Sequence, residues 1–164
     1  MNDEKGQLSG EYMLLVGSLI VVLMISIFMI ANENELNIAM AAAKSGADEG
    51  VASSSSAIYP KETFNEYDDM EGLKHPYSVS IVNVSYNSSG IDENYGKQKI
   101  QFKVYAKASV DYNKKELDSI GDRINYNLRK SVATSFNTTN STNKLYNPVF
   151  SNNYVFTTAN VVWV

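Results

Sequence analysis

The sequence predicts an α+β protein in which a long N-terminal helix carries a C-terminal head made of a β-sheet and one further helix. Three patterns lead to this fold. Residues 12–31 form an apolar run without a charged residue. Residues 97–112 alternate apolar and polar side chains, which is typical of a strand with one face packed and one face in water. Residues 113–133 repeat apolar side chains at helical spacing.

The apolar run is expected to span a membrane as a helix. About 20 residues at a rise of about 1.5 Å cover about 30 Å, the thickness of the hydrocarbon core of a bilayer. Beyond residue 31 the chain turns polar without a helix breaker, so we expect one continuous helix over residues 8–52. Its second half has a stripe of small or apolar residues, which lets another element approach closely. This stripe consists of Leu36, Ala39, Ala43, Ala47 and Val51.

Three roles are open for this N-terminal stretch. A signal anchor would stay in the membrane and hold a domain outside. A secretory signal peptide would be removed, and Ala39-Met40-Ala41 offers a small-residue site, but the apolar run is longer than the usual core of about 7–15 residues. In a pilin-type signal the cut falls before the apolar run, and the mature protein keeps the run.

The residues ahead of the run read Gly6-Gln7-Leu8-Ser9-Gly10-Glu11-Tyr12. This box resembles the class III signal peptide of archaeal type IV pilins and pilin-like proteins, which is written G-Q-x-S-x-E-[YF]. The resemblance implies that a prepilin peptidase cuts between Gly6 and Gln7. It also implies that Glu11, the fifth mature residue, serves assembly with other pilin subunits into a homo- or heteropolymer.

The resemblance divides the chain into four parts with different roles. They are a cleaved leader (1–6), a transmembrane and assembly helix (7–31), its amphipathic continuation (32–56) and an extracellular α+β head (57–164). The fold implied for the whole chain is that of a type IV pilin.

The chain has a formal charge of −4 and no basic patch, so nucleic acid is not an evident partner.

The head is expected to hold an antiparallel β-sheet. Residues 77–86 and 97–112 would pair as a hairpin, with residues 87–96 as the loop between them. Three short β segments would finish the chain, at residues 144–150, 153–158 and 160–164, with Trp163 partly buried.

The further helix of the head has a clear start and a clear buried face. Asn113 and Glu116 form a capping-box pattern, and the helix is expected to run to about residue 133. Its apolar stripe is core material. The stripe consists of Leu117, Ile120, Ile124, Leu128 and Val132.

No enzyme activity, cofactor or metal is expected. The chain has no cysteine and a single histidine, His75, so it has neither a Cys–His pair nor a histidine metal cluster. Five carboxylates lie between residues 62 and 71, but their spacing matches no EF-hand loop. We interpret that stretch as a solvated acidic loop.

Four N-x-[ST] sequons are candidates for N-glycosylation: Asn83, Asn87, Asn137 and Asn140. The last three lie in predicted loops, where a transferase can reach them, and Asn83 lies within a predicted strand. Chance occurrence in a chain rich in Asn, Ser and Thr is the alternative.

We interpret the sequence as a major or minor pilin of an archaeal type IV-like pilus that serves surface adhesion. The subunit would first be a single-pass membrane protein with its head outside, and would then enter a pilus on the cell surface. Two alternatives stay open. One is a membrane-anchored extracellular binding module that does not polymerise, and the other is an anchored surface enzyme.

Overall fold

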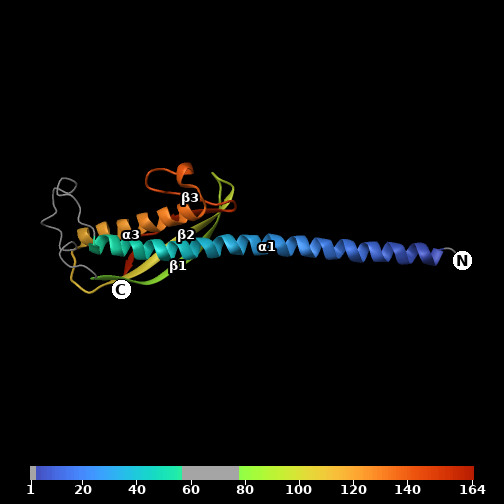
Figure 1. Ribbon diagram of the computed structural model, residues 1–164, viewed down its shortest axis with the longest axis horizontal. Helices are drawn as coiled ribbons and strands as arrows, with labels where there is room; N and C mark the ends of the chain where they lie inside the picture. Colours follow the sequence, from blue (N-terminus) through green and yellow to red (C-terminus); the bar gives the residue numbers. More distant parts are fainter. Residues whose placement is uncertain (1–2, 57–77) are drawn as a thin grey trace. The chain divides into compact units, whose positions relative to one another are not determined.

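The computed structural model describes residues 3–56 and 78–164, with side-chain detail for residues 10–53 and 78–164. The described elements are helix α1 (Asp3–Ser56), strands β1 (Val79–Asp92) and β2 (Lys97–Ala108), helix α3 (Lys114–Ser135), the 3-10 helix η3 (Thr139–Ser141), and strands β3 (Val149–Phe150), β4 (Tyr154–Thr158) and β5 (Val162–Trp163) (Figure 1). The chain divides into two units, Met1–Asn37 and Ile38–Val164. Over these described residues the architecture is α+β, with a long apolar N-terminal helix, a mixed sheet and one further helix.

Helix α1 is one uninterrupted helix of 54 residues. It confirms the continuous helix expected from the sequence, and it extends further at both ends, to Asp3 and to Ser56. Acidic residues near a helix N-terminus complement the macrodipole, which favours a start at Asp3 and Glu4. The first proline of the chain is Pro60, so the sequence contains no strong breaker before the helix ends.

The C-terminal part of α1 packs against α3 in the second unit, and the two helices run antiparallel (Figure 1). The alanines of the predicted stripe are fully buried: Ala39, Ala43 and Ala47. A Cβ placed on Gly46 would lie 2.6 Å from the carbonyl oxygen of Asn127, and one on Gly50 would lie 2.7 Å from the Cα of Ile124. The backbones of the two helices therefore meet at glycines, and the stripe of small residues is confirmed as a packing face.

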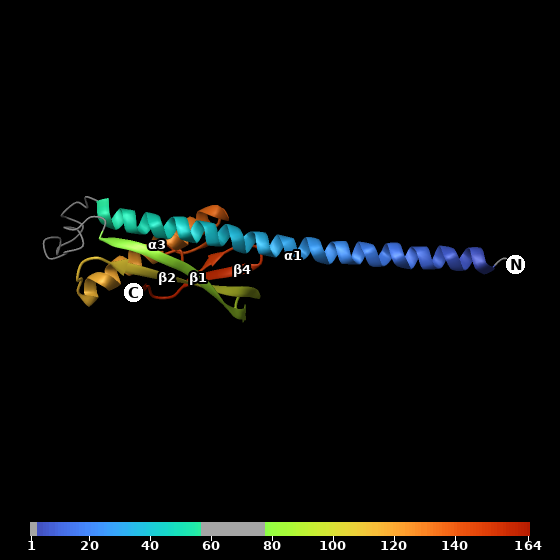
Figure 2. The ribbon, with the colours of Figure 1, turned by 90° about the horizontal axis from the view of Figure 1, so that it is seen from below.

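The sheet is built around β2. The strand order is β1-β2-β4-β3, and β5 also pairs with β2 (Figure 2). The β1–β2 hairpin is antiparallel as expected, but β4 and β5 run parallel to β2, so the prediction of an antiparallel sheet is wrong. The reason is the connection: α3 carries the chain back toward the start of β2, and a strand that follows such a crossover runs parallel.

Strand β1 is longer than the sequence predicted. It continues through the stretch that was expected to be a loop, with Asn87 opposite Gln101, and after an irregularity in register it places Ile91 opposite Gln98. Gly90 lies at that irregularity with a φ of 82°, which favours glycine. The prediction of a loop at residues 87–90 is therefore wrong, because a bulge absorbs the turn-forming residues without ending the strand.

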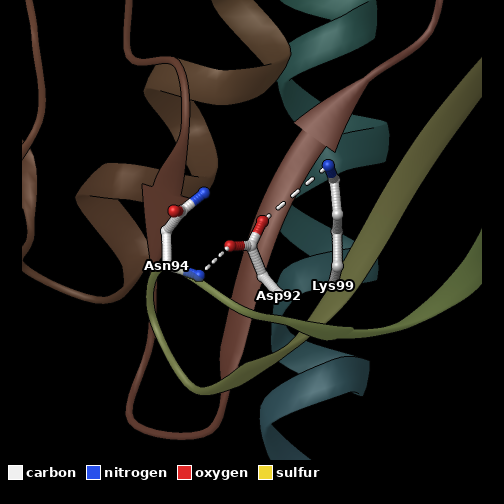
Figure 3. Close-up of polar contacts among 3 residues, drawn as sticks. All are labelled: Asp92, Asn94 and Lys99. Carbon is white, nitrogen blue, oxygen red and sulfur yellow. Dashed lines mark hydrogen bonds and ion pairs between the residues drawn. The ribbon is translucent and has the colours of Figure 1, made fainter.

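The turn that closes the hairpin is organised by Asp92. Its Oδ1 accepts a hydrogen bond from the Asn94 backbone N–H at 3.0 Å, and its Oδ2 lies 3.8 Å from the Lys99 Nζ (Figure 3). The Gly96 N–H donates to the Asp92 carbonyl at 2.8 Å, and Gly96 has a φ of 63°. The turn thus depends on the side chain of Asp92 and on the backbone freedom of Gly96.

The core lies between the helices and one face of the sheet. The predicted alternation of β2 is confirmed, since one set of its side chains is almost completely buried: Ile100, Phe102, Val104 and Ala106. The ring of Phe156 from β4 stacks on Phe102 at 5.6 Å between centroids and on Phe136, which follows α3, at 5.7 Å. The stripe of α3 is buried as predicted except for Leu117, which is half-buried.

Two strands are shorter than expected. β2 ends at Ala108 rather than at residue 112, and β3 has only two residues and begins at Val149. Trp163 is half-buried and pairs with Ala106, so its predicted place in the sheet is confirmed. Backbone pairing of β5 with β2 therefore fixes the C-terminal indole beside α3.

The capping box of α3 is formed as predicted, and replacing Asn113 with Ala is expected to destabilise the fold by about 1 kcal/mol. The Asn113 Oδ1 accepts from the Glu116 N–H at 2.9 Å, and the Glu116 Oε2 accepts from the Asn113 N–H at 2.9 Å. Denaturant unfolding measures the effect, with Asn113→Ser as the control that keeps a capping oxygen. Equal losses in the Ser and Ala variants would show that the cap does not stabilise α3.

Candidate functional site

The first candidate site is the segment of α1 that is apolar on all its faces. From Tyr12 to Ile30 its large apolar side chains are 51–76% exposed, apart from Val16, which is half-buried. The helix is long and apolar enough to cross a membrane. Each large apolar side chain left in water forgoes roughly 1.5–3 kcal/mol of burial free energy, so contact with lipid or with other apolar surfaces would stabilise this segment.

Two serines interrupt the apolar run, and both satisfy their hydroxyls within the helix. The Ser18 hydroxyl donates to the Leu15 carbonyl at 2.8 Å, and the Ser26 hydroxyl donates to the Val22 carbonyl at 2.9 Å. A hydroxyl bonded to its own helix adds little cost in an apolar medium. The serines are therefore compatible with burial in lipid or in a helix bundle.

The three residues that the signal box singles out all lie in α1. Gly6 and Gln7 belong to its first turns, and Glu11 follows Gln7 by four residues, so the two positions share one helix face. The Glu11 side chain is exposed and lies directly before the uncharged run. A cut between Gly6 and Gln7 would remove the first turn of α1 and bring Glu11 close to a new helix N-terminus.

All four candidate glycosylation sites have exposed side chains. Asn83 and Asn87 both lie in β1, whose other edge has no partner strand among the described elements. Asn137 follows α3 with a φ of 55°, and Asn140 lies in η3. Asn87 is thus on a strand edge rather than in the loop expected from the sequence, while the placement of Asn137 and Asn140 outside strands and long helices holds.

Glycosylation at Asn137 or Asn140 is the expected result in a host that has the machinery, because both acceptors are exposed outside the sheet. Glycopeptide mass spectrometry on native protein measures it, and Asn137→Gln and Asn140→Gln identify the modified position. Bare peptides in a host that glycosylates its other surface proteins would contradict this prediction.

Two sequence features lie outside the described residues. These are the acidic stretch at residues 62–71 and His75. Among residues that the structure does describe, no group of three or more His, Cys, Asp or Glu side chains is placed to hold a metal ion.

A second candidate site, which sequence reasoning missed, is a groove on the head between α3 and the C-terminal segment. Its volume is about 280 Å³, and Asp118, Asp122, Asn125 and Trp163 are among the residues that line it. The carboxylates of Asp118 and Asp122 are exposed and one helical turn apart. The sequence does show two acids at i and i+4 on the polar face of the helix. Only the fold shows that the indole of Trp163 lies beside them.

Asn125 is the unusual member of this groove. It is 5% exposed, and its Nδ2 donates to the Ala159 carbonyl at 2.9 Å, while its Oδ1 has no hydrogen-bond partner among the described residues. A buried acceptor without a partner costs about 1–3 kcal/mol. The Asn125 Oδ1 is therefore a buried acceptor without a hydrogen-bond partner in the described part of the chain.

Arg129 interacts electrostatically with Asp122, one of the acids that line this groove. Burial lowers the pKa of its guanidinium, and the nearby Asp122 carboxylate opposes that lowering. Its Nε donates to the Leu145 carbonyl at 3.1 Å and its Nη1 to the Thr158 hydroxyl at 2.5 Å. The guanidinium is therefore hydrogen-bonded to residues that follow α3, and Arg129 is not among the residues that line the groove.

Comparison with family models, with curated proteins and with solved structures gives no match to this chain.

Proposed function

We propose that this chain is a structural subunit of an archaeal type IV-like pilus, processed by a prepilin peptidase and assembled through α1. One observation carries the proposal: a single helix joins the G-Q-x-S-x-E-Y box and an exposed apolar segment to the packed face of an α+β unit. A helix of this kind supplies a membrane segment and continues without a break into the head unit. The resemblance of the signal box to class III signals gives these parts their roles.

In the proposed cycle the apolar part of α1 changes its surroundings without entering water. Before processing it lies in the membrane with the head outside the cell. After cleavage it moves into a bundle of like helices, which keeps its apolar surface away from water. Because lipid and a helix bundle both keep these apolar side chains out of water, the transfer need not oppose the hydrophobic effect.

The head would then form the outer surface of the filament. Its exposed sequons would carry glycans there, and its surface would make the contacts that lead to adhesion. Neither role requires a catalytic centre, which agrees with the proposal of a structural subunit.

The proposal predicts that native protein lacks residues 1–6 and begins at Gln7. Intact-mass measurement of protein from the native host tests this, and Gly6→Val is expected to block processing because a β-branched side chain is bulky where the peptidase accepts glycine. Gly10→Val, which lies beyond the cut and has open space around its Cα, is the control. A native N-terminus at Met1 or near Ala42 would exclude a pilin-type signal.

The alternative of an anchored binding module that does not polymerise makes a different prediction. Such a protein would stay entirely in the membrane fraction, whereas a pilus subunit is also recovered in filaments sheared from the cell surface. The distribution of wild-type protein between these two fractions decides between the two functions.

A further inference from the structure

The turn of the β1–β2 hairpin holds two large side chains in the open. Ile91 is 74% exposed and Tyr95 is 48% exposed. The turn between them is ordered by hydrogen bonds from the Asn94 and Gly96 backbone N–H groups to Asp92. Single exposed apolar residues are common on protein surfaces, so what these two side chains contact has to be inferred from where the turn lies.

A series of contacts within the head unit fixes the position of this turn. The Tyr95 ring packs edge-on against Phe150, with 5.0 Å between the ring centroids. The Thr138 hydroxyl in turn donates to the Phe150 carbonyl at 3.1 Å. Since Thr138 lies just after the end of α3 at Ser135, the hairpin turn lies at the end of the head where α3 finishes.

Helix α1 enters the head at this same end. A Cβ on Gly50 would meet Ile124 of α3, and a Cβ on Gly46, one turn earlier in α1, would meet Leu128, one turn later in α3. Moving toward the N-terminus of α1 therefore leads toward the C-terminal end of α3, and the head unit begins at Ile38. Within the head, Figures 1 and 2 both show the hairpin turn at the end where α1 enters.

The entry of α1 is also the part of the head that follows the apolar run most closely along the chain. The run ends at Ala31, and α1 continues as a helix to Ile38, a rise of about 10 Å. The headgroup layer on each side of a bilayer is about 5–8 Å thick. When α1 spans a membrane, the entry end of the head therefore stays near the lipid headgroups.

We propose that the hairpin turn inserts Ile91 and Tyr95 into the headgroup layer of the membrane that α1 spans. Tyrosine is favoured at this depth, because its ring is apolar and its hydroxyl is polar. The turn brings no net charge to the headgroups, since its two acids are balanced by two lysines: Asp92, Glu93, Lys97 and Lys99. The inference rests on the membrane stage of the proposed function and does not depend on filament formation.

The chain contains no cysteine, so one introduced cysteine reports on one position. Asn94→Cys places a nitrobenzoxadiazole label at the turn, where Asn94 uses its backbone N–H for the contact with Asp92. The labelled full chain is reconstituted in phosphatidylcholine vesicles in which part of the lipid carries a nitroxide on its headgroup. Because interfacial segments insert by about 5–10 Å, we expect quenching at least about twofold stronger than for a label at Ser80→Cys, near the start of β1.

Ile91→Asn in the Asn94→Cys chain removes the most exposed apolar side chain of the turn, and it is expected to lower quenching to the level at residue 80. Val82→Asn is the matched control. It replaces a 58% exposed apolar residue of the same strand, away from the turn, and should leave quenching unchanged. Leu19→Cys, in the apolar run, reports on the anchor itself and should be quenched by a nitroxide on the acyl chains.

Quenching at residue 94 that equals quenching at residue 80, or that survives Ile91→Asn, would overturn the proposal. In either case strong quenching at residue 19 would leave the membrane anchor intact. A blue shift of the label at residue 94 without quenching by lipid would show that the turn packs on protein, such as a second copy of the chain, and would also overturn it. Absence of quenching at residue 19 would overturn both this contact and the membrane stage of the proposed function.

Discussion

Replacing Gly46 or Gly50 with Ala is expected to destabilise the head unit by about 1–3 kcal/mol for each substitution, the usual cost of overpacking a close interface. A methyl group on Gly46 would lie 2.6 Å from the Asn127 carbonyl oxygen and 2.8 Å from the Leu128 Cα. Both are backbone atoms, so no side chain can rotate away and the helices must separate. The gain in helix propensity, about 0.5–1 kcal/mol, offsets only part of this cost.

Denaturant unfolding followed by Trp163 fluorescence measures the change, and α3 contains its own control. Gly121 is also a helical glycine, but a methyl group there would lie 3.4 Å from its nearest neighbour, which is ordinary contact. Gly121→Ala is therefore expected to stabilise the fold by about 0.5–1 kcal/mol. A stabilising effect at Gly46 and Gly50 as well would mean that α1 and α3 do not approach as closely as the backbone contacts indicate.

These glycines illustrate what could be predicted from the sequence. Residues 32–52 were expected to form a helix with a close-packing stripe of alanines, and they do. From the sequence, Gly46 and Gly50 indicate only a weaker helix propensity in the last turns. Their role in contact with α3 depends on which residue lies opposite, and helical periodicity does not contain that information.

The local signals of the head were equally reliable. The capping box at Asn113, the alternation of β2 and the apolar stripe of α3 all depend on neighbours within a few residues, and each is present. The predictions that were wrong concern strand pairing between residues far apart in the sequence. The parallel pairing of β4 with β2 depends on where α3 delivers the chain, and the length of β1 depends on a bulge that keeps pairing with β2 past Ser88.

The groove on the head could not be predicted because its parts are far apart in the sequence. Asp118 and Trp163 are brought together by the pairing of β5 with β2, which is itself part of the unexpected parallel arrangement. The N-terminal site is the opposite case. Its residues are contiguous, from Gly6 to the end of the apolar run, so the signal box can be recognised from the sequence alone.

Replacing Glu11 with Ala is expected to leave cleavage and membrane insertion intact and to reduce recovery in sheared filaments at least tenfold. In a bundle of apolar helices a carboxylate requires a partner, and cleavage after Gly6 creates an α-amino group at Gln7, one helical turn away on the same face. The new helix N-terminus adds its positive dipole end beside Glu11. Removing one member of a buried ion pair costs about 3–5 kcal/mol, which is more than the 1.4 kcal/mol of a tenfold change.

The assay compares the ratio of processed protein in the membrane fraction to protein in sheared filaments for wild type, Glu11→Ala and Glu33→Ala. Glu33 is also an exposed acid of α1, but it lies beyond the apolar run and should tolerate the change. Glu11→Gln keeps the shape and loses the charge, and we expect it to assemble as poorly as the Ala variant, because the amine would then lack its counter-ion. If Glu11→Ala enters filaments as the wild type does, Glu11 lies at the lipid headgroup level, and subunit register is set elsewhere in the helix.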